Sequence, residues 1–189
     1  MHRSYAAAVL SCTLALGAAP ASAGPELLPA QSEIGFVCKQ MGVPVEGGFT
    51  RFAAQVDFDP RRPQGGAVSL TVDLASAVLP TAEAQDEVAK PDWFDTRKFP
   101  RAEFRSNRIR ALGSGRYEIA GSLTIKGRAR EVVVPLTLAQ SGAITVASGS
   151  FSIRRIDFGV GDGEWSDTSI VADDVQVRFK LALKGIASL

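Results

Sequence analysis

Residues 174–183 read DVQVRFKLAL, and this stretch decides the fold. The apolar residues are Val175, Val177, Phe179, Leu181 and Leu183. The positions between them hold Asp174, Gln176, Arg178, Lys180 and the small Ala182. Successive side chains of an extended chain point to opposite faces, so this period of two predicts a strand with one apolar face and one polar face.

The same alternation recurs along most of the chain. Further strands are predicted at residues 33–41, 48–58, 68–74, 102–111, 117–126, 132–138 and 143–153. Ser114-Gly115, Lys126-Gly127 and Ser141-Gly142 lie between alternating runs, as the turns of β-hairpins do. Pro135 has the opposite parity to its apolar neighbours and predicts a sheet edge or a bulge, because proline cannot donate to a ladder.

These patterns predict an all-β protein. About eight strands with short turns are typical of a closed antiparallel barrel or a sandwich. We expect the closed, lipocalin-like barrel, with one short helix at 81–89 as an insertion that covers a mouth. Neither a repeat nor a linker divides residues 24–189, so we expect a single domain there.

The N-terminus has the pattern of an export signal. Arg3 precedes a mostly apolar stretch at 5–19, Pro20 breaks it, and residues 21–23 read Ala-Ser-Ala. This predicts a secretory signal peptide at 1–23 with cleavage after Ala23. The apolar stretch is too short for a membrane anchor, and lipidation at Cys12 is the alternative. In a Gram-negative bacterium the protein would be periplasmic.

Composition excludes several function classes once residues 1–23 are removed. The removed segment holds the only histidine, His2, and one of the 21 basic residues, which leaves as many basic as acidic residues. A chain without histidine cannot form a Ser-His-Asp or Cys-His catalytic set, or a histidine-containing zinc site. Zero net charge argues against a nucleic-acid partner. The remaining thiol, Cys38, cannot form an internal disulfide.

Polar clusters offer weaker candidates for chemistry. Asp92, Asp95, Asp162, Glu164 and Asp167 flank Trp93 and Trp165. Carboxylates beside aromatic rings suggest a hydrolase, although turn-forming acidic residues in glycine-rich loops explain the same pattern. Cys38 shares the parity of Ile34 and Phe36, which favours a structural thiol on the apolar face.

Basic residues beside aromatic ones form another candidate. Arg97, Lys98 and Arg101 lie close in sequence to Trp93, Phe94 and Phe99. Such a group suits a ligand head group or transient contact with a membrane surface.

Eight segments resemble the YceI-like family, in the order in which the family has them. They are 32–36 (SEIGF), 39–43 (KQMGV), 48–52 (GFTRF), 56–60 (VDFDP), 93–95 (WFD), 98–104 (KFPRAEF), 121–127 (GSLTIKG) and 155–159 (RIDFG). The resemblance implies a periplasmic, lipocalin-like barrel that encloses a polyisoprenoid or similar lipid, acts in binding or transport rather than catalysis, and forms a homodimer in some members. Many members carry histidine at the position of Gln40, and a small or aliphatic residue at that of Cys38.

We therefore expect an exported carrier of an apolar lipid: a polyisoprenoid, an isoprenoid quinone, or a fatty acid or amide. No other cofactor and no metal are expected. The predicted ligand-binding residues are Ile34, Phe36, Cys38, Gln40, Phe49, Val56, Val68, Leu70, Val72, Trp93, Phe94, Phe99, Phe104, Ile119, Leu123 and Ile125. Among these, Trp93, Phe94 and Phe99 would form the mouth or lid, whereas Arg155 and Asp157 are expected to be structural. The alternatives are a hydrolase and an interaction module for a membrane redox partner with a filled barrel.

Overall fold

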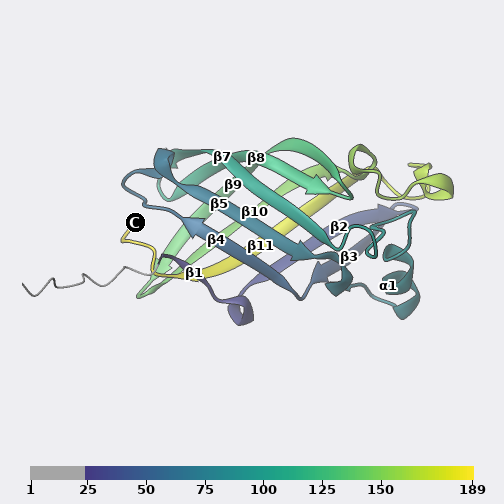
Figure 1. The fold of residues 1–189 in the computed structure, drawn as a ribbon, viewed down its shortest axis with the longest axis horizontal. Coiled ribbons are helices and arrows are strands. Elements are labelled where there is room, and N and C mark those ends of the chain that lie inside the picture. Colours follow the sequence, from purple (N-terminus) through teal and green to yellow (C-terminus); the bar gives the residue numbers. More distant parts are fainter. Residues whose placement is uncertain (1–23) are drawn as a thin grey trace, which may run out of the picture.

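The computed structural model describes residues 24–189, which form one long, curled sheet (Figure 1). The predicted signal peptide at 1–23 lies outside the described residues. The strands are β1 (Glu26–Leu27), β2 (Glu33–Gln40), β3 (Val43–Phe49), β4 (Phe52–Asp57), β5 (Ala67–Asp73), β6 (Ala77–Val78), β7 (Arg101–Gly113), β8 (Arg116–Ile125), β9 (Arg128–Ser141), β10 (Ile144–Arg154) and β11 (Asp174–Lys184). The helices are α1 (Ala82–Val88) and the 3₁₀ turns η1 (Pro29–Gln31), η2 (Pro63–Gly65), η3 (Leu74–Ser76), η4 (Arg155–Phe158) and η5 (Gly163–Ser166).

All strand pairs are antiparallel, and they follow one hydrogen-bonded path. The order is β4-β5-β7-β8-β9-β10-β11-β2-β3-β6, with β1 added beside β11. Within residues 24–189 no strand pair joins β4 to β3 or to β6. The all-β prediction is therefore confirmed, but the sheet has eleven strands, and its pairing does not close the barrel of about eight strands that the sequence predicted.

The open ends of the sheet arise from a corner that sequence reasoning missed. We predicted one strand at 48–58, whereas the structure breaks it at Thr50 and Arg51 into β3 and β4. The backbone N–H of Thr50 donates to the carbonyl of Ser76 at 3.2 Å, and that of Arg51 donates to Ser76 Oγ at 3.0 Å. Asp73 N–H in turn donates to the carbonyl of Arg51 at 3.0 Å. These bonds hold the corner, so β3 and β4 diverge to opposite parts of the sheet.

The predicted turns join neighbouring strands. Ser114 and Gly115 both have positive φ between β7 and β8, and so do Lys126 and Gly127 between β8 and β9. Two positive φ angles are characteristic of the two-residue turns that match strand twist. Pro135 lies next to Leu136, where the pairing of β9 with β10 ends. The missing N–H of proline is thus tolerated at a partial edge, as predicted.

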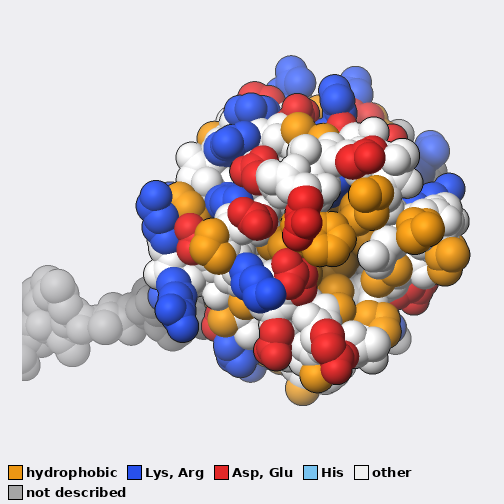
Figure 2. Space-filling view, turned by 90° about the vertical axis from the view of Figure 1, so that its right-hand side faces the viewer, with side chains coloured by type: hydrophobic (Ala, Val, Ile, Leu, Met, Phe, Trp, Pro, Cys, Tyr) orange, Lys and Arg blue, Asp and Glu red, His pale blue; other side chains and the backbone are white. Residues whose placement is uncertain are grey.

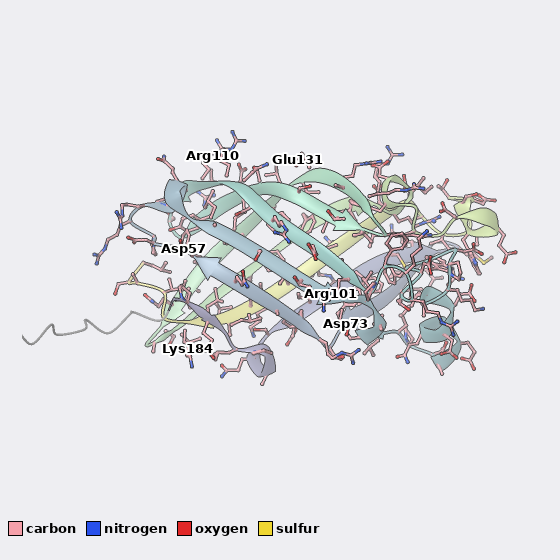
Figure 3. The ribbon with its side chains drawn as sticks, viewed as in Figure 1. Asp57, Asp73, Arg101, Arg110, Glu131 and Lys184 are labelled. Atoms are coloured by element: carbon pink, nitrogen blue, oxygen red, sulfur yellow. The ribbon has the colours of Figure 1, made fainter. Side chains whose placement is uncertain are left out.

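The two faces of the sheet differ as the alternation predicts. In β8 the inward residues, such as Ile119 and Leu123, are buried. The charged side chains labelled in Figure 3 project from the outer surface. Some form ion pairs there, such as Arg51 with Asp73 at 2.9 Å. Exposed pairs of this kind contribute at most about 1 kcal/mol each, so burial of the inner face is the larger stabilising term.

One end of the curled sheet carries most of the irregular structure. There α1 lies at the same end of the sheet as the loops that hold η4 and η5, whereas the C-terminus lies at the opposite end (Figure 1). The hydroxyl of Thr81 accepts from Ala84 N–H at 3.2 Å and caps α1, so the helix predicted at 81–89 is confirmed. The helices within residues 24–189 are all too short or too polar to span a bilayer.

Candidate ligand-binding cavity

The inner faces of the strands enclose a cavity of about 540 Å³. This volume lies within the range of small-molecule sites, which is roughly 300–1,000 Å³. Gln40, Glu83, Glu87 and Arg155 are the only amide or charged side chains among the described residues that line it. The rest of the wall is almost entirely apolar. This cavity disagrees with one of the alternatives above, in which the interior is filled by the protein's own side chains.

Parity reasoning selected residues that reach this wall. Fifteen of the sixteen predicted ligand-binding residues line the cavity. They are Ile34, Phe36, Cys38, Gln40, Phe49, Val56, Val68, Leu70, Val72, Trp93, Phe94, Phe104, Ile119, Leu123 and Ile125. Their contact with a ligand stays a prediction.

Phe99 is the exception, because it is absent from the cavity lining. Its ring packs over the β8–β9 turn, where a Cβ on Gly127 would lie 2.9 Å from Phe99 Cε1. Lys98 Nζ lies 5.2 Å from the centroid of the same ring. Phe99 therefore helps to fix the turn and is not part of the cavity lining.

Three phenylalanine rings lie flat against the wall because glycines face them across the sheet. Phe36 is paired with Gly47, and Phe179 with Gly149. The Phe104 ring likewise lies close to Gly121. An ideal Cβ on any of these glycines would come within 3.0 Å of the facing ring. The absent side chains leave room for the rings at the wall, which keeps the centre of the cavity open.

A buried arginine organises the loop at the α1 end. Arg155 is 2 % exposed, and its guanidinium donates five hydrogen bonds of 2.7–3.0 Å. The acceptors are the backbone carbonyls of Val160, Gly161, Trp165, Val171 and Ala172. One side chain thus ties together three parts of the loop between β10 and β11. These bonds agree with the structural role expected for Arg155.

Arg155 also gives this end of the cavity a positive charge. Burial lowers the pKa of its guanidinium, and the nearby charge of Asp173 opposes that effect. The guanidinium carbon lies 5.9 Å from the centroid of the Trp93 ring, a distance at which cation–π attraction acts. Sequence reasoning did not foresee that Arg155 lines the cavity, because charged residues are rarely fully buried.

Two tryptophans meet beside this arginine. The ring centroids of Trp93 and Trp165 are 5.6 Å apart, with the rings tilted by 51°. Both rings line the cavity. Trp165 was missing from the predicted site, since it lies in a loop without periodicity. Trp165 follows the glycine-rich run at 159–163, and that sequence does not indicate in which direction the side chain points.

Acidic side chains surround the opening at the α1 end. Figure 2 shows apolar surface at the centre of this end with Asp and Glu side chains around it. Glu83 and Glu87 of α1 belong to the cavity lining. The opening therefore combines an apolar recess with a negatively charged rim.

The carboxylates proposed for a hydrolase lie elsewhere. Asp92, Asp95, Asp162 and Glu164 are all absent from the cavity lining. The backbone carbonyl of Asp92 accepts from the N–H groups of Gly161 and Asp162, each at 2.8 Å. Asp162 also lies 3.5 Å from Lys126 Nζ. These contacts tie the loop at Asp92 to the loop at Asp162 and to Lys126.

Cys38 and the predicted basic group have different environments. Cys38 is half-buried in the cavity wall. Burial raises the pKa of its thiol, and the charge of Arg155 partly offsets that rise.

Arg97, Lys98 and Arg101 are exposed outside the cavity. These three side chains therefore do not form part of the cavity wall, and their contact with a ligand head group or with a membrane surface stays a prediction.

Comparison with known proteins agrees with the geometry. Residues 26–183 match the model of the YceI-like domain. A UPF0312 protein of Photorhabdus laumondii is 30 % identical over 134 residues, which cover 66 % of this chain and 69 % of that protein. A UPF0312 protein of Vibrio cholerae is 25 % identical over 157 residues, or 78 % of this chain and 83 % of that protein.

Solved structures share the fold. BcnA of Burkholderia cenocepacia is 46 % identical with a TM-score of 0.81, and the match covers 83 % of this chain and 99 % of BcnA. A polyisoprenoid binding domain from Saccharophagus degradans has a TM-score of 0.71 at 14 % identity, over 86 % of this chain and 98 % of that domain, which shows a common fold alone. From the domain match and these similarities, the chain belongs to the YceI-like family.

Proposed function

We propose that this protein binds one long, apolar lipid inside the curled sheet and carries or stores it without chemical change. The ligand class is a polyisoprenoid, an isoprenoid quinone, or a fatty acid or amide. The single observation that carries the proposal is the cavity of about 540 Å³ with its nearly uniform apolar wall. Burial of a ligand's apolar surface there stabilises the complex by roughly 25 cal/mol per Å².

Family membership supports the same function. The Saccharophagus degradans domain, which shares the fold, is described as polyisoprenoid-binding. The opening beside α1 gives a lipid tail a route into the interior, and the paired phenylalanines and glycines keep the interior wide enough to receive it.

We further propose that the protein acts outside the cytoplasm. The sequence pattern of 1–23 supports export, with a mature chain that begins at Gly24. N-terminal sequencing of the protein purified from the periplasm of its host tests this part. A mature N-terminus at Met1 would contradict it.

Organic extraction followed by mass spectrometry tests lipid binding directly. The mature chain is purified from cells without added lipid, extracted with chloroform and methanol, and compared with a soluble protein of similar size purified in parallel. We expect the extract to be enriched in a lipid relative to the control protein, at a fixed ratio of no more than one lipid molecule per chain. The proposal fails if the extract contains no enriched lipid and if titration with an 11-dansylamino-undecanoic acid probe also shows no binding.

A further inference from the structure

The α1 end of the cavity contains two hydrogen-bond donors without acceptors. Trp93 Nε1 and Trp165 Nε1 are both buried, and neither has a hydrogen-bond partner within the described part of the chain. Most buried polar groups of folded proteins have a partner. Leaving a buried donor unpaired costs about 1–3 kcal/mol. Two such donors in adjacent rings of one cavity wall therefore require an explanation.

Neither indole N–H donates to any acceptor of the described residues. The carbonyls of the adjacent loop, including that of Trp165 itself, bind the guanidinium of Arg155 instead. The guanidinium uses its five N–H groups in these bonds, so it contributes positive charge but no further donor to the cavity. The wall beside the two indoles thus carries the buried positive charge of Arg155 and two unpaired donors, whereas the acidic residues Glu83 and Glu87 line the same cavity from α1.

We propose that Trp93 and Trp165 form the head-group subsite of the cavity and bind an oxygen acceptor of the lipid. A carbonyl oxygen, as in a quinone, an amide or a carboxylate, has the required chemistry: it accepts from an indole N–H, and its negative charge or dipole faces Arg155. This inference rests on the proposed lipid-binding function and adds the position and chemistry of the head group.

Binding in this way needs a small rotation of the rings, because both nitrogens are covered in the structure. The outer side-chain torsion of tryptophan has a broad energy profile, and both rings border the open cavity, which leaves space for such a rotation. The lipid tail then extends from the tryptophans toward the far end of the cavity, where Phe58 and Tyr117 line the wall and their ring centroids are 5.4 Å apart.

The test compares three probes of the same isoprenoid chain: a methyl ketone (farnesylacetone), a carboxylate (farnesoate) and a hydrocarbon without oxygen. Each is titrated into the mature wild type, Trp93→Phe and Trp165→Phe. Phenylalanine keeps an aromatic ring but removes the donor. Each substitution should weaken binding of an oxygen-bearing probe about two- to tenfold more than binding of the hydrocarbon, as expected for one lost hydrogen bond. The matched control is Phe58→Leu at the far end, which should change the affinities of all three probes by the same factor.

Spectra of ¹⁵N-labelled protein give a second readout that a merely structural role would not move. The chain has two tryptophans, both within the mature segment, so two indole N–H signals are expected. The ketone or the carboxylate should move these signals downfield, whereas the hydrocarbon should not. A shift with the ketone identifies a neutral acceptor as sufficient, and a shift with the carboxylate alone identifies an anionic head group. Either result supports the subsite.

The possible failures are distinguishable. If none of the three isoprenoid probes binds, an isoprenoid ligand and the head-group subsite are both refuted; if, in addition, the extract contains no enriched lipid and the dansyl fatty-acid probe does not bind, the lipid-binding function itself is refuted. If all three bind but the Trp→Phe substitutions affect them equally, and no oxygen-bearing probe moves an indole signal, lipid binding stands and the head-group subsite is overturned.

Discussion

The ring of Phe36 lies directly over Gly47, its partner across the β2–β3 ladder. A Cβ on Gly47 would lie 2.3 Å from Phe36 Cζ, and the other two nearest atoms belong to the same ring. At Gly121 and Gly149 an added Cβ would also come too close to backbone atoms, whereas at Gly47 the three nearest atoms all belong to the Phe36 ring. This pair therefore isolates the effect of ring position on the cavity.

Gly47→Ala should narrow the cavity. The added methyl forces the Phe36 ring off the wall and toward the interior, since the φ of Gly47 is one that alanine can adopt. We expect a loss of about 1–3 kcal/mol in the free energy of unfolding, as overpacking usually costs. Affinity for the dansyl fatty-acid probe should fall about fivefold, the equivalent of about 1 kcal/mol. Urea denaturation and fluorescence titration measure the two effects.

Two further variants make this prediction specific. Gly65→Ala is the matched control, because a Cβ there meets open space. It should leave both the stability and the affinity unchanged. Adding Phe36→Leu to Gly47→Ala should restore part of the affinity. Unchanged probe binding in Gly47→Ala would show that the ring position does not limit the ligand.

Leu70→Trp should block the cavity itself. Leu70 lies on the inner face of β5, and its neighbour Thr71 has the opposite parity and does not line the cavity. A tryptophan at 70 occupies space that a lipid tail would need, so we expect at least a tenfold loss of probe affinity, about 1.4 kcal/mol. Thr71→Trp adds the same side chain on the outer face and should bind like the wild type. Equal affinity of both variants would place the ligand outside the cavity.

Sequence alternation predicted the lining so well because strand geometry leaves little choice. Once Ile34, Phe36 and Cys38 share a parity, they share a face, whatever strand lies beside them. Parity does not reveal which strands pair, however. The alternation at 48–58 changes parity at the corner, since Phe49 lines the cavity from an odd position and Val56 from an even one. A single strand cannot do both, so this shift was the sign of the break between β3 and β4, but it did not show where the two strands go. That corner depends on hydrogen bonds to Ser76, which is distant in sequence.

The mouth was harder to predict because its residues belong to loops. Phe99 was predicted at the mouth but packs on the turn at Gly127, and Trp165 was not among the predicted ligand-binding residues but lines the cavity. Loop side chains have no periodicity from which to infer a direction. Arg155 has the structural role that was expected, but its burial in the cavity wall was not predicted. That burial depends on the backbone carbonyls of residues 160–172, which come together only in the folded loop.

Arg155→Met should destabilise the protein strongly. The substitution leaves the carbonyls that bind the guanidinium without donors, and it removes the contacts that join the loop between β10 and β11. We expect a loss of about 3 kcal/mol or more in the free energy of unfolding. The neighbouring Arg154→Met is the control, since the Arg154 side chain is 65 % exposed in its ion pair with Asp173 and should cost less than about 1 kcal/mol. Similar losses in the two variants, measured by urea denaturation, would contradict the organising role of Arg155.

Cys38 should make stability depend on pH in the alkaline range. Burial raises the pKa of its thiol in the folded chain, so the folded state holds the proton more tightly than the unfolded state does. The contribution of Cys38 to the free energy of unfolding should therefore be constant below the ordinary thiol pKa and should decrease as the pH rises above it. Cys38→Ala removes this titration, and the difference between the two unfolding curves isolates it. The same shift predicts that iodoacetamide alkylates the folded chain more slowly at pH 8 than the urea-unfolded chain, because less thiolate is present. Equal alkylation rates in the two states, together with equal pH dependence of wild type and Cys38→Ala, would show that the cavity wall does not shield this thiol.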